Sequence, residues 1–218
     1  MRDAATRIVL VTSGASGLGA DVARELASAD THVIVNFRDD AANAERVVAD
    51  IRTAGGTAST LAGDIADEAA TVSMIDSIAA RFGRLDAMIL NAAGGLELGA
   101  DPGYAMRRNR DAQRRLALLG MPLMPVGGRI VFVTSHQAHF FPNKAVPKGH
   151  VAVAASQRAG ETALYALRSE FARAGVQFTV VSGNMSDDTF ASAIVNSANT
   201  PNPTGIVYVG GAHYLMTA

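Results

Sequence analysis

Seven short runs of β-branched and apolar residues recur along the whole chain, separated by longer segments with helical periodicity. The runs cover residues 8–12, 32–37, 59–62, 87–90, 129–134, 177–181 and 205–209. Most of them are continuously apolar, which is typical of strands that are covered on both faces of a parallel sheet. Because strand–helix–strand alternation implies right-handed crossovers, we expect an α/β fold with a doubly wound parallel sheet of about seven strands and helices on both faces.

The chain of 218 residues holds no proline- or serine-rich linker, so we expect one domain covering residues 1–218. An apolar stripe from Val153 to Phe171 predicts a long helix. The stretches 136–149 and 196–205 carry clusters of Asn, Pro or Gly and are expected to be loops.

Composition excludes several classes of function. The 19 basic and 20 acidic residues give a net charge of −1, which provides no attraction to nucleic acid or to an anionic membrane. There is no cysteine, so thiolate metal sites and cysteine nucleophiles are excluded. No apolar run approaches the ~18 residues of a membrane-spanning helix, and the run 8–11 is too short for a signal peptide. We therefore expect a cytoplasmic protein.

A glycine-rich turn follows the first predicted strand and opens the first predicted helix. It comprises Ser13, Gly14, Ala15, Ser16, Gly17, Leu18 and Gly19. Glycines at such a turn let the backbone approach a pyrophosphate, and the helix N-terminus offers free N–H groups and a positive dipole end. The position of the turn at the start of a βαβ unit predicts a dinucleotide-binding site.

Several motifs, in order along the chain, resemble those of the short-chain dehydrogenase/reductase family. The turn resembles the family's T-G-x-x-x-G-x-G pattern, with Ser13 in place of the first glycine. The other matches are Asp64 at the end of the third strand, Asn91-Ala92-Ala93-Gly94, Asn109, the strand 128–135 that ends in Ser135, and the closing segment 207–211. The resemblance covers nearly the whole chain and implies a Rossmann-type fold that binds a nicotinamide dinucleotide and acts on a small-molecule carbonyl or alcohol.

The resemblance also implies site residues and an assembly. The residues expected to contact the cofactor are Ser13, Gly14, Ser16, Gly17, Leu18, Gly19, Asn36, Arg38, Asp64, Ile65, Asn91, Ala92, Gly94, Gln157 and Gly183. In the family, the helices that correspond to the one around Asn109 and to residues 150–174 often form subunit interfaces, so a homodimer or homotetramer is expected.

The end of the second strand predicts which dinucleotide is bound. An acidic residue there would bind both ribose hydroxyls of NAD and repel a 2′-phosphate. The chain instead has Asn36 and Arg38, and a guanidinium group can bind a phosphate with two hydrogen bonds. We therefore favour NADP(H) over NAD(H), although Asp39 and Asp40 are close enough in sequence to neutralise Arg38 locally.

The catalytic motif of the family is only partly present. Ser135 fits the family's serine, which donates a hydrogen bond to the carbonyl oxygen, and Asn109 fits its asparagine. The family's tyrosine, the proton donor, aligns with Val153, and its lysine, which lowers the pKa of the tyrosine, aligns with Gln157. A glutamine can bond a ribose hydroxyl but brings no charge.

Other residues could supply the missing proton. His150 lies one helical turn before Val153, and imidazole titrates near neutral pH, so His150 is the preferred candidate. Lys144 and Lys148, the only lysines, are expected in a surface loop, and Tyr104 is a weaker candidate.

Two further patterns are assigned no site. His136, His139 and His150 lack the spacing of a zinc motif, so no metal is expected. The arginine cluster 107–115 is interpreted as a solvated or interface surface. The segment 183–204 leaves residues 189–199 for a helix and predicts a shortened substrate lid. The sequence thus predicts a divergent NADP(H)-dependent oxidoreductase; the alternative is a catalytically weak or inactive cofactor-binding protein of the same fold.

Overall fold

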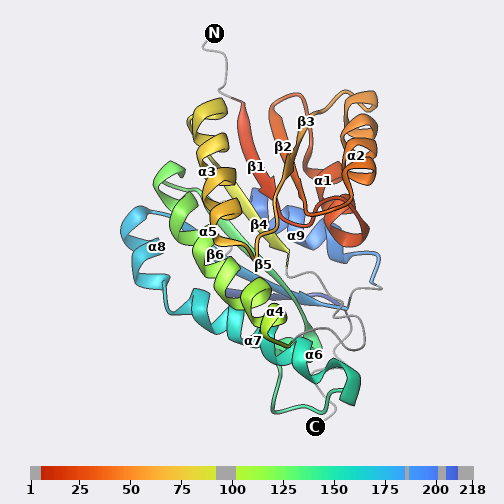
Figure 1. Cartoon of the computed structure of the whole chain (residues 1–218), viewed down its shortest axis with the longest axis vertical. Coiled ribbons are helices and arrows are strands. Elements are labelled where there is room, and N and C mark those ends of the chain that lie inside the picture. The colour runs from red at the N-terminus through yellow and green to blue at the C-terminus, as the bar shows by residue number, and fades with distance from the viewer. Residues whose placement is uncertain (1–5, 92–101, 185–186, 201–204, 211–218) are drawn as a thin grey trace.

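The computed structural model describes residues 6–91, 102–184, 187–200 and 205–210. These residues form one parallel sheet in the order β3-β2-β1-β4-β5-β6-β7 (Figure 1). The strands are β1 (Arg7–Val11), β2 (Thr31–Phe37), β3 (Thr57–Ala62), β4 (Ala87–Asn91), β5 (Arg129–Ser135), β6 (Gln177–Gly183) and β7 (Gly205–Tyr208). The predicted fold class, a doubly wound parallel sheet, is confirmed.

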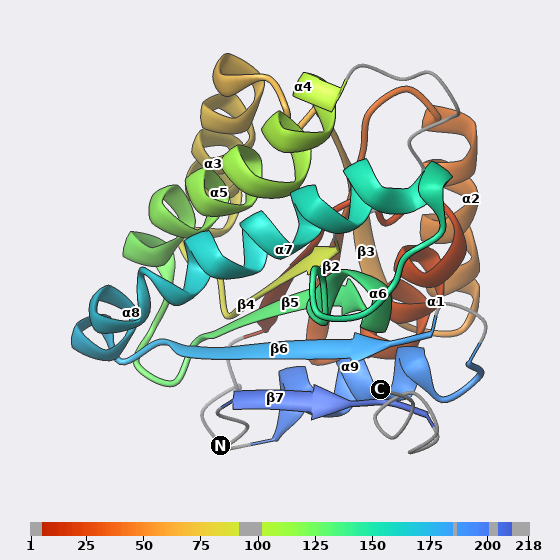
Figure 2. The ribbon, with the colours of Figure 1, turned by 90° about the horizontal axis from the view of Figure 1, so that it is seen from below.

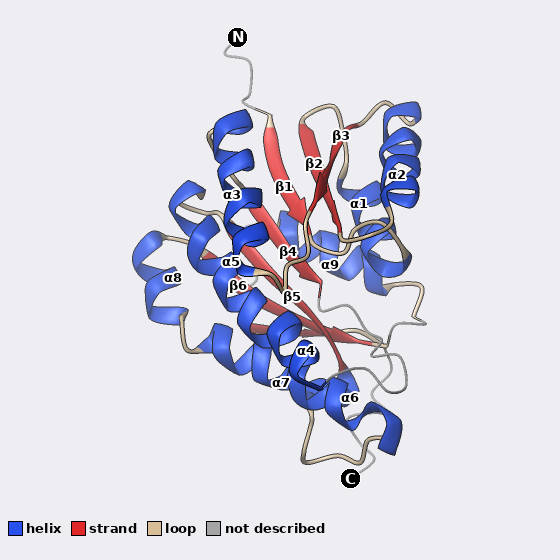
Figure 3. Cartoon of the chain, in the orientation of Figure 1, coloured by secondary structure: helices blue, strands red, loops and turns tan. Residues whose placement is uncertain are grey.

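Helices cover both faces of the sheet. They are α1 (Gly17–Leu26), α2 (Ala41–Thr53), α3 (Glu68–Phe82), α4 (Pro102–Met106), the π-helical η1 (Arg107–Asp111), α5 (Ala112–Gly120), α6 (His136–His139), α7 (Val151–Tyr165), α8 (Arg168–Ala174) and α9 (Phe190–Asn199), with short 3₁₀ turns η2 (Met121–Leu123) and η3 (Lys148–His150). Helices α1, α2 and α9 pack on one face, and α3, α5, α7 and α8 pack on the other (Figures 2 and 3). The result is a three-layer molecule with two apolar cores.

The continuous apolar runs of the sequence are explained by these two cores. In β1, Val9 and Val11 enter the core beneath α1, α2 and α9, while Ile8 and Leu10 enter the core beneath α3 and α5. All four side chains are almost completely buried. A strand covered on both faces has no solvent-facing position that would require a polar residue, so its sequence does not alternate.

The topology also fixes where a ligand can bind. The chain runs from β1 outward through β2 to β3, and then returns to β4 on the other side of β1. The order of the strands therefore reverses between β1 and β4, and open α/β sheets bind ligands at such a point, outside the carboxyl ends of the strands. The β1–α1 turn lies at that edge.

Three of the expected local boundaries need correction. The stripe from Val153 to Phe171 is divided between α7 and α8, which are separated at residues 166–167. The expected loop 136–149 begins with the helix α6, because the Ser135 hydroxyl caps it by accepting a hydrogen bond from the N–H of Ala138 at 3.2 Å. The expected loop 196–205 is helical as far as Asn199, the end of α9.

Candidate functional site

The β1–α1 turn is tightly built on one side and open on the other. A Cβ on Gly19 would overlap the carbonyl oxygen of Ser13, so the first turn of α1 can approach the loop only with glycine. Gly17 has a φ of 50°, and a Cβ there would meet nothing within 4 Å. The loop therefore presents its backbone to open space beside the N-terminus of α1, which is the geometry that a diphosphate requires.

Ser13 takes the position of the family's first glycine and has the backbone conformation of a glycine. Its φ is 51°, in the left-handed region that side chains disfavour by roughly 1–2 kcal/mol. Among the described residues it is the one non-glycine with a positive φ. A side chain at this position is therefore kept at a cost.

Asn36 ties the turn to the neighbouring strands. Its Oδ1 accepts a hydrogen bond from the N–H of Ser13 at 3.3 Å, and its Nδ2 donates to the carbonyl oxygens of Leu61 at 3.2 Å and Gly63 at 3.0 Å. The Asn36 side chain is buried. Its observed contacts thus hold the ends of β1, β2 and β3 in register, and a buried amide does so without a net charge.

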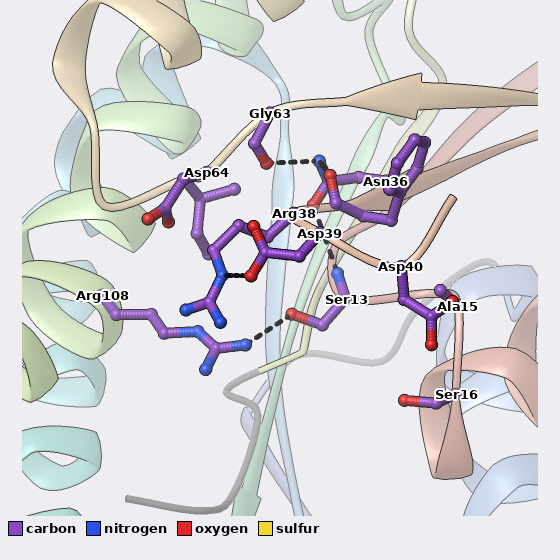
Figure 4. A pocket seen from close by; sticks show the side chains of 12 residues that line it. Ser13, Ala15, Ser16, Asn36, Arg38, Asp39, Asp40, Gly63, Asp64 and Arg108 are labelled. Carbon is purple, nitrogen blue, oxygen red and sulfur yellow. Dashed lines mark hydrogen bonds and ion pairs between the residues drawn. The ribbon is translucent and has the colours of Figure 1, made fainter. Parts of the chain in front are cut away.

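A pocket of about 520 Å³ opens between the turn and the ends of β2 and β3 (Figure 4). Its lining includes the predicted cofactor residues Ser13, Ser16, Asn36, Arg38, Asp64 and Ile65. The volume lies in the range of about 300–1,000 Å³ that small-molecule sites occupy. The pocket and the open side of the turn therefore fit the adenosine end of a dinucleotide.

Arg38 stands in this pocket with its charge largely compensated. It forms an ion pair with Asp39 and donates a hydrogen bond to the hydroxyl of Tyr104 at 2.6 Å. Asp39 and Tyr104 raise the pKa of Arg38 above its ordinary value by stabilising the charged form. The Tyr104 hydroxyl is also 3.2 Å from Oδ2 of Asp64. Tyr104, a weaker candidate for the proton donor in the sequence, thus contacts two residues that line the pocket, Arg38 and Asp64.

Arg108 also lines the pocket, and it was not among the cofactor residues predicted from the sequence. It projects from η1, and its Nη2 donates to the hydroxyl of Ser13 at 3.2 Å (Figure 4). The arginine cluster was expected to be solvated or to form an interface, but this member reaches the cofactor pocket. The sequence signal that could have found it is its position next to Asn109.

Three further predicted cofactor residues, Asn91, Gly14 and Gly183, lie along the same edge. The backbone N–H of Asn91 bonds the Thr12 hydroxyl at 2.9 Å, which joins the ends of β4 and β1. Gly14 lies within the turn, and Leu18 packs on the apolar core below it. Gly183 ends β6, and a Cβ there would lie 2.9 Å from the ring of Phe190. Ala92 and Gly94 lie outside the described residues.

Ser135 ends β5 and is hydrogen-bonded to the residue at the family's lysine position. Its hydroxyl donates to Oε1 of Gln157 at 3.5 Å, a long hydrogen bond. Gln157 is buried in α7. Because a hydroxyl carries one proton, Ser135 must release Gln157 before it can donate to a substrate oxygen.

Asn109 lies in the π-helical turn η1, an irregularity that is frequent at functional sites. Its Nδ2 donates to the Ser156 hydroxyl at 3.0 Å, and Ser156 donates to the carbonyl oxygen of Val153 at 2.8 Å. Its Oδ1 is buried and has no hydrogen-bond partner in the part of the chain that the structure describes. An unpaired buried acceptor is costly, so this atom is suited to accept from a water or a ligand.

The candidate proton donors are less well placed. His150 precedes the first residue of α7 and has an exposed side chain. Its N–H donates to the carbonyl of Pro147 at 2.8 Å, and no described hydrogen bond joins it to Ser135. Lys148 is exposed, and the ammonium of Lys144 lies over the ring of Phe140. The role of His150 stays a prediction.

The two histidines after Ser135 form a buried polar network. The ring nitrogens of His136 bond the Ser182 hydroxyl and the Val209 carbonyl, both at 2.9 Å. His139 bonds the carboxylate of Glu161 at 2.9 Å and the hydroxyl of Tyr208 at 3.1 Å. These bonds tie α6 to α7, β6 and β7. The described residues hold no group of three or more metal-binding side chains, and none of their helices has the length and apolar character needed to cross a bilayer.

Comparison with known proteins places this arrangement in a family. The family model for short chain dehydrogenase matches residues 7–200. The 1-cyclohexenylcarbonyl-CoA reductase of Streptomyces collinus is 28% identical over 92% of this chain and 72% of that protein. The probable tetrahydroxynaphthalene reductase of Zymoseptoria tritici is 32% identical over 72% of this chain and 59% of that protein. Short chain dehydrogenase/reductase AacuN of Aspergillus aculeatus is 33% identical over 66% of this chain and 56% of that protein. This chain therefore spans less than two thirds of the length of each of the last two relatives.

Solved structures agree in fold. A Burkholderia cenocepacia short chain dehydrogenase in complex with NADP has a TM-score of 0.82 at 24% identity, covering 96% of this chain and 99% of that one. A metagenomic short-chain oxidoreductase in complex with NADP has a TM-score of 0.81 at 23% identity, covering 94% and 97%. The sequence resemblance is thereby confirmed: this chain belongs to the short chain dehydrogenase family.

Proposed function

We propose that this protein is an NADP(H)-dependent oxidoreductase that interconverts a carbonyl group and an alcohol on a small-molecule substrate. The observation that carries the proposal is the pocket beside the β1–α1 turn, which two guanidinium groups, Arg38 and Arg108, line. The 2′-phosphate distinguishes NADP from NAD, and arginine favours it. The relatives that are reductases, and the structural neighbours that were solved in complex with NADP, support the same assignment.

The residues present can hold such a cofactor through main-chain N–H groups and flanking side chains. The turn from Ser13 to Gly19 would take the diphosphate on main-chain N–H groups at the start of α1. Asp64 and Ile65 would flank the adenine, and Asn91, Gln157 and Gly183 would lie toward the nicotinamide end. When bound, the cofactor supplies or accepts the hydride.

The catalytic residues would stabilise the oxygen of the substrate. We assign Ser135 to donate a hydrogen bond to that oxygen as charge develops on it. Asn109, through its unpaired Oδ1, would hold a water or a backbone donor. The proton would come from His150 or from solvent, because Val153 cannot supply one and the uncharged Gln157 cannot lower the pKa of a neighbouring hydroxyl electrostatically.

A binding titration followed by a turnover assay tests the proposal. NADPH should bind at micromolar concentration and more tightly than NADH, and a panel of carbonyl compounds should be reduced with NADPH. Binding without turnover on any compound would favour the catalytically inactive alternative, and no binding of either nucleotide would end the proposal. The pH profile of the His150→Ala variant then decides the proton donor: unchanged turnover and an unchanged profile remove His150.

We further propose a cytoplasmic homodimer or homotetramer, built as one domain with a shortened lid at residues 183–204. The family resemblance supports subunit contacts through the helices around η1 and α7. Light scattering during size-exclusion chromatography measures the assembly, and a single monomeric mass would contradict it.

A further inference from the structure

The two arginines of the cofactor pocket differ in how their charges are compensated. Arg38 is paired with Asp39, and Tyr104 binds it further through a hydrogen bond and a ring contact at 5.8 Å. The guanidinium group of Arg108 has one hydrogen-bond partner among the described residues, the neutral hydroxyl of Ser13, and forms no ion pair with them. The available positive charge of the pocket is therefore that of Arg108.

The carboxylates around the pocket make this charge necessary for a phosphate. Asp39, Asp40 and Asp64 line the pocket together with the two guanidinium groups, so three formal negative charges face two positive ones. A phosphate group brings close to two further negative charges at neutral pH. Like charges within a few ångströms repel, so phosphate binding requires a cation that is not already neutralised.

The contact with Ser13 indicates that the fold specifies the position of the Arg108 guanidinium group. Ser13 has a φ of 51°, where glycine would be relaxed, and its side chain holds the guanidinium at the mouth of the turn. A bond to a neutral hydroxyl is weaker than a bond between a guanidinium and a phosphate, so a phosphate can replace the hydroxyl at a net gain. The strained serine thus holds the arginine near the place where a phosphate would bind.

We propose that Arg108 determines the specificity of this protein for NADP(H) by binding the 2′-phosphate, with Ser13 as its positioning residue. The inference rests on the proposed function, because it assigns a role within that cofactor site. Arg38 contributes less than its place at the end of β2 would suggest, because Asp39 already occupies it.

The test compares variants by calorimetric titration of the full chain. The probes are NADPH, NADH, and the fragments 2′,5′-ADP and 5′-AMP, which differ in the same phosphate. Arg108→Gln should weaken binding of NADPH and 2′,5′-ADP by about 10- to 100-fold, the size of a lost hydrogen bond to a charged group, and leave NADH and 5′-AMP within about threefold. Arg110→Gln is the matched control, since Arg110 lies on the same turn but pairs with Asp111 and does not line the pocket.

Two further variants keep the test decisive. Arg108→Lys retains the charge and should keep most of the preference for NADPH, a result that a purely structural role would not give. Arg38→Gln should weaken NADPH binding less than Arg108→Gln does. The inference is overturned if wild type prefers NADPH and a folded Arg108→Gln keeps that preference; the proposed function then stands. If wild type binds neither nucleotide, both fail.

Discussion

The part of the molecule from β1 to β4, which contains the β1–α1 turn, and residues 109–170, which contain Asn109 and Ser135, differ in how completely their buried polar groups are paired. We call them the cofactor half and the catalytic half. Among the described residues, the buried side-chain polar atoms without a hydrogen-bond partner all belong to residues 109–170, including Asn109, Gln113 and Thr134. The part that precedes them, from β1 to β4, contains none. Since a buried unpaired polar atom costs roughly 1–3 kcal/mol, this cost is confined, among the described residues, to the second half.

The difference follows the motif along the chain. The β1–α1 turn keeps glycine at Gly17, where φ is positive, and at Gly19, where the backbone approaches closely, and departs from the family at Ser13. The start of α7 has Val153 and Gln157 at the positions of the tyrosine and lysine. The turn thus keeps most of the family's pattern, whereas the start of α7 has lost both the tyrosine and the lysine, so experiments should change the halves separately.

The largest expected effect comes from restoring the altered half. The double variant Val153→Tyr with Gln157→Lys should raise kcat for carbonyl reduction by about 10²- to 10⁴-fold, the usual contribution of a positioned general acid. Turnover with NADPH under saturating conditions measures it, with Gln157→Lys alone as the control. An unchanged kcat in a folded double variant would mean that the two halves differ by more than these residues.

Removing the hydroxyl at the end of β5 should have the next largest effect. Ser135→Ala should lower kcat by about 10²- to 10³-fold, because one donor to a developing oxyanion is lost. The same change removes the cap of α6 and should cost about 1 kcal/mol of stability. Ser135→Thr keeps a hydroxyl and should retain both the donor and the cap, so kcat and the free energy of unfolding, measured on both variants, report the two effects. Equal kcat in all three proteins would exclude Ser135 from the chemistry.

Close packing between η1 and α7, within the catalytic half, predicts a stability effect. A Cβ on Gly160 of α7 would overlap the carbonyl oxygen of Asn109, so Gly160→Ala should push η1 and α7 apart and cost about 1–3 kcal/mol. Denaturant unfolding measures the loss, with Ala152→Ser at the exposed start of α7 as the control. Wild-type stability of Gly160→Ala would show that the contact is looser than described.

The smallest effect is expected at the turn itself. Ser13→Gly relieves about 1–2 kcal/mol of left-handed strain and loses about 0.5–1 kcal/mol through the greater freedom of glycine in the unfolded chain. The free energy of unfolding should therefore rise by up to about 1.5 kcal/mol. A free energy of unfolding below that of the wild type would show that the hydrogen bond between Ser13 and Arg108 stabilises the protein by more than the strain costs.

Much of the fold is readable from the sequence because each strand is short, apolar and bounded by turns. Local capping was harder to predict: Ser135 begins α6 through a single hydrogen bond to the N–H of Ala138. The division of the stripe from Val153 to Phe171 was also missed, since a break that keeps apolar residues on one face leaves the periodicity intact.

The site was predictable only where its residues are consecutive or follow a strand. Arg108 is 95 residues from its partner Ser13, and only the three-dimensional packing of η1 beside the turn brings the two together. His139 meets Glu161 and Tyr208, which are 22 and 69 residues away. No spacing rule links such residues, so sequence reasoning assigned them to a solvated surface or to no site.

Calorimetric titration of the unmodified chain with NADPH and with NADH tests the central claim most directly. The account predicts saturable binding of one nucleotide per chain at micromolar concentration, with NADPH the tighter of the two. Absence of heat for both nucleotides, or tighter binding of NADH, would contradict it.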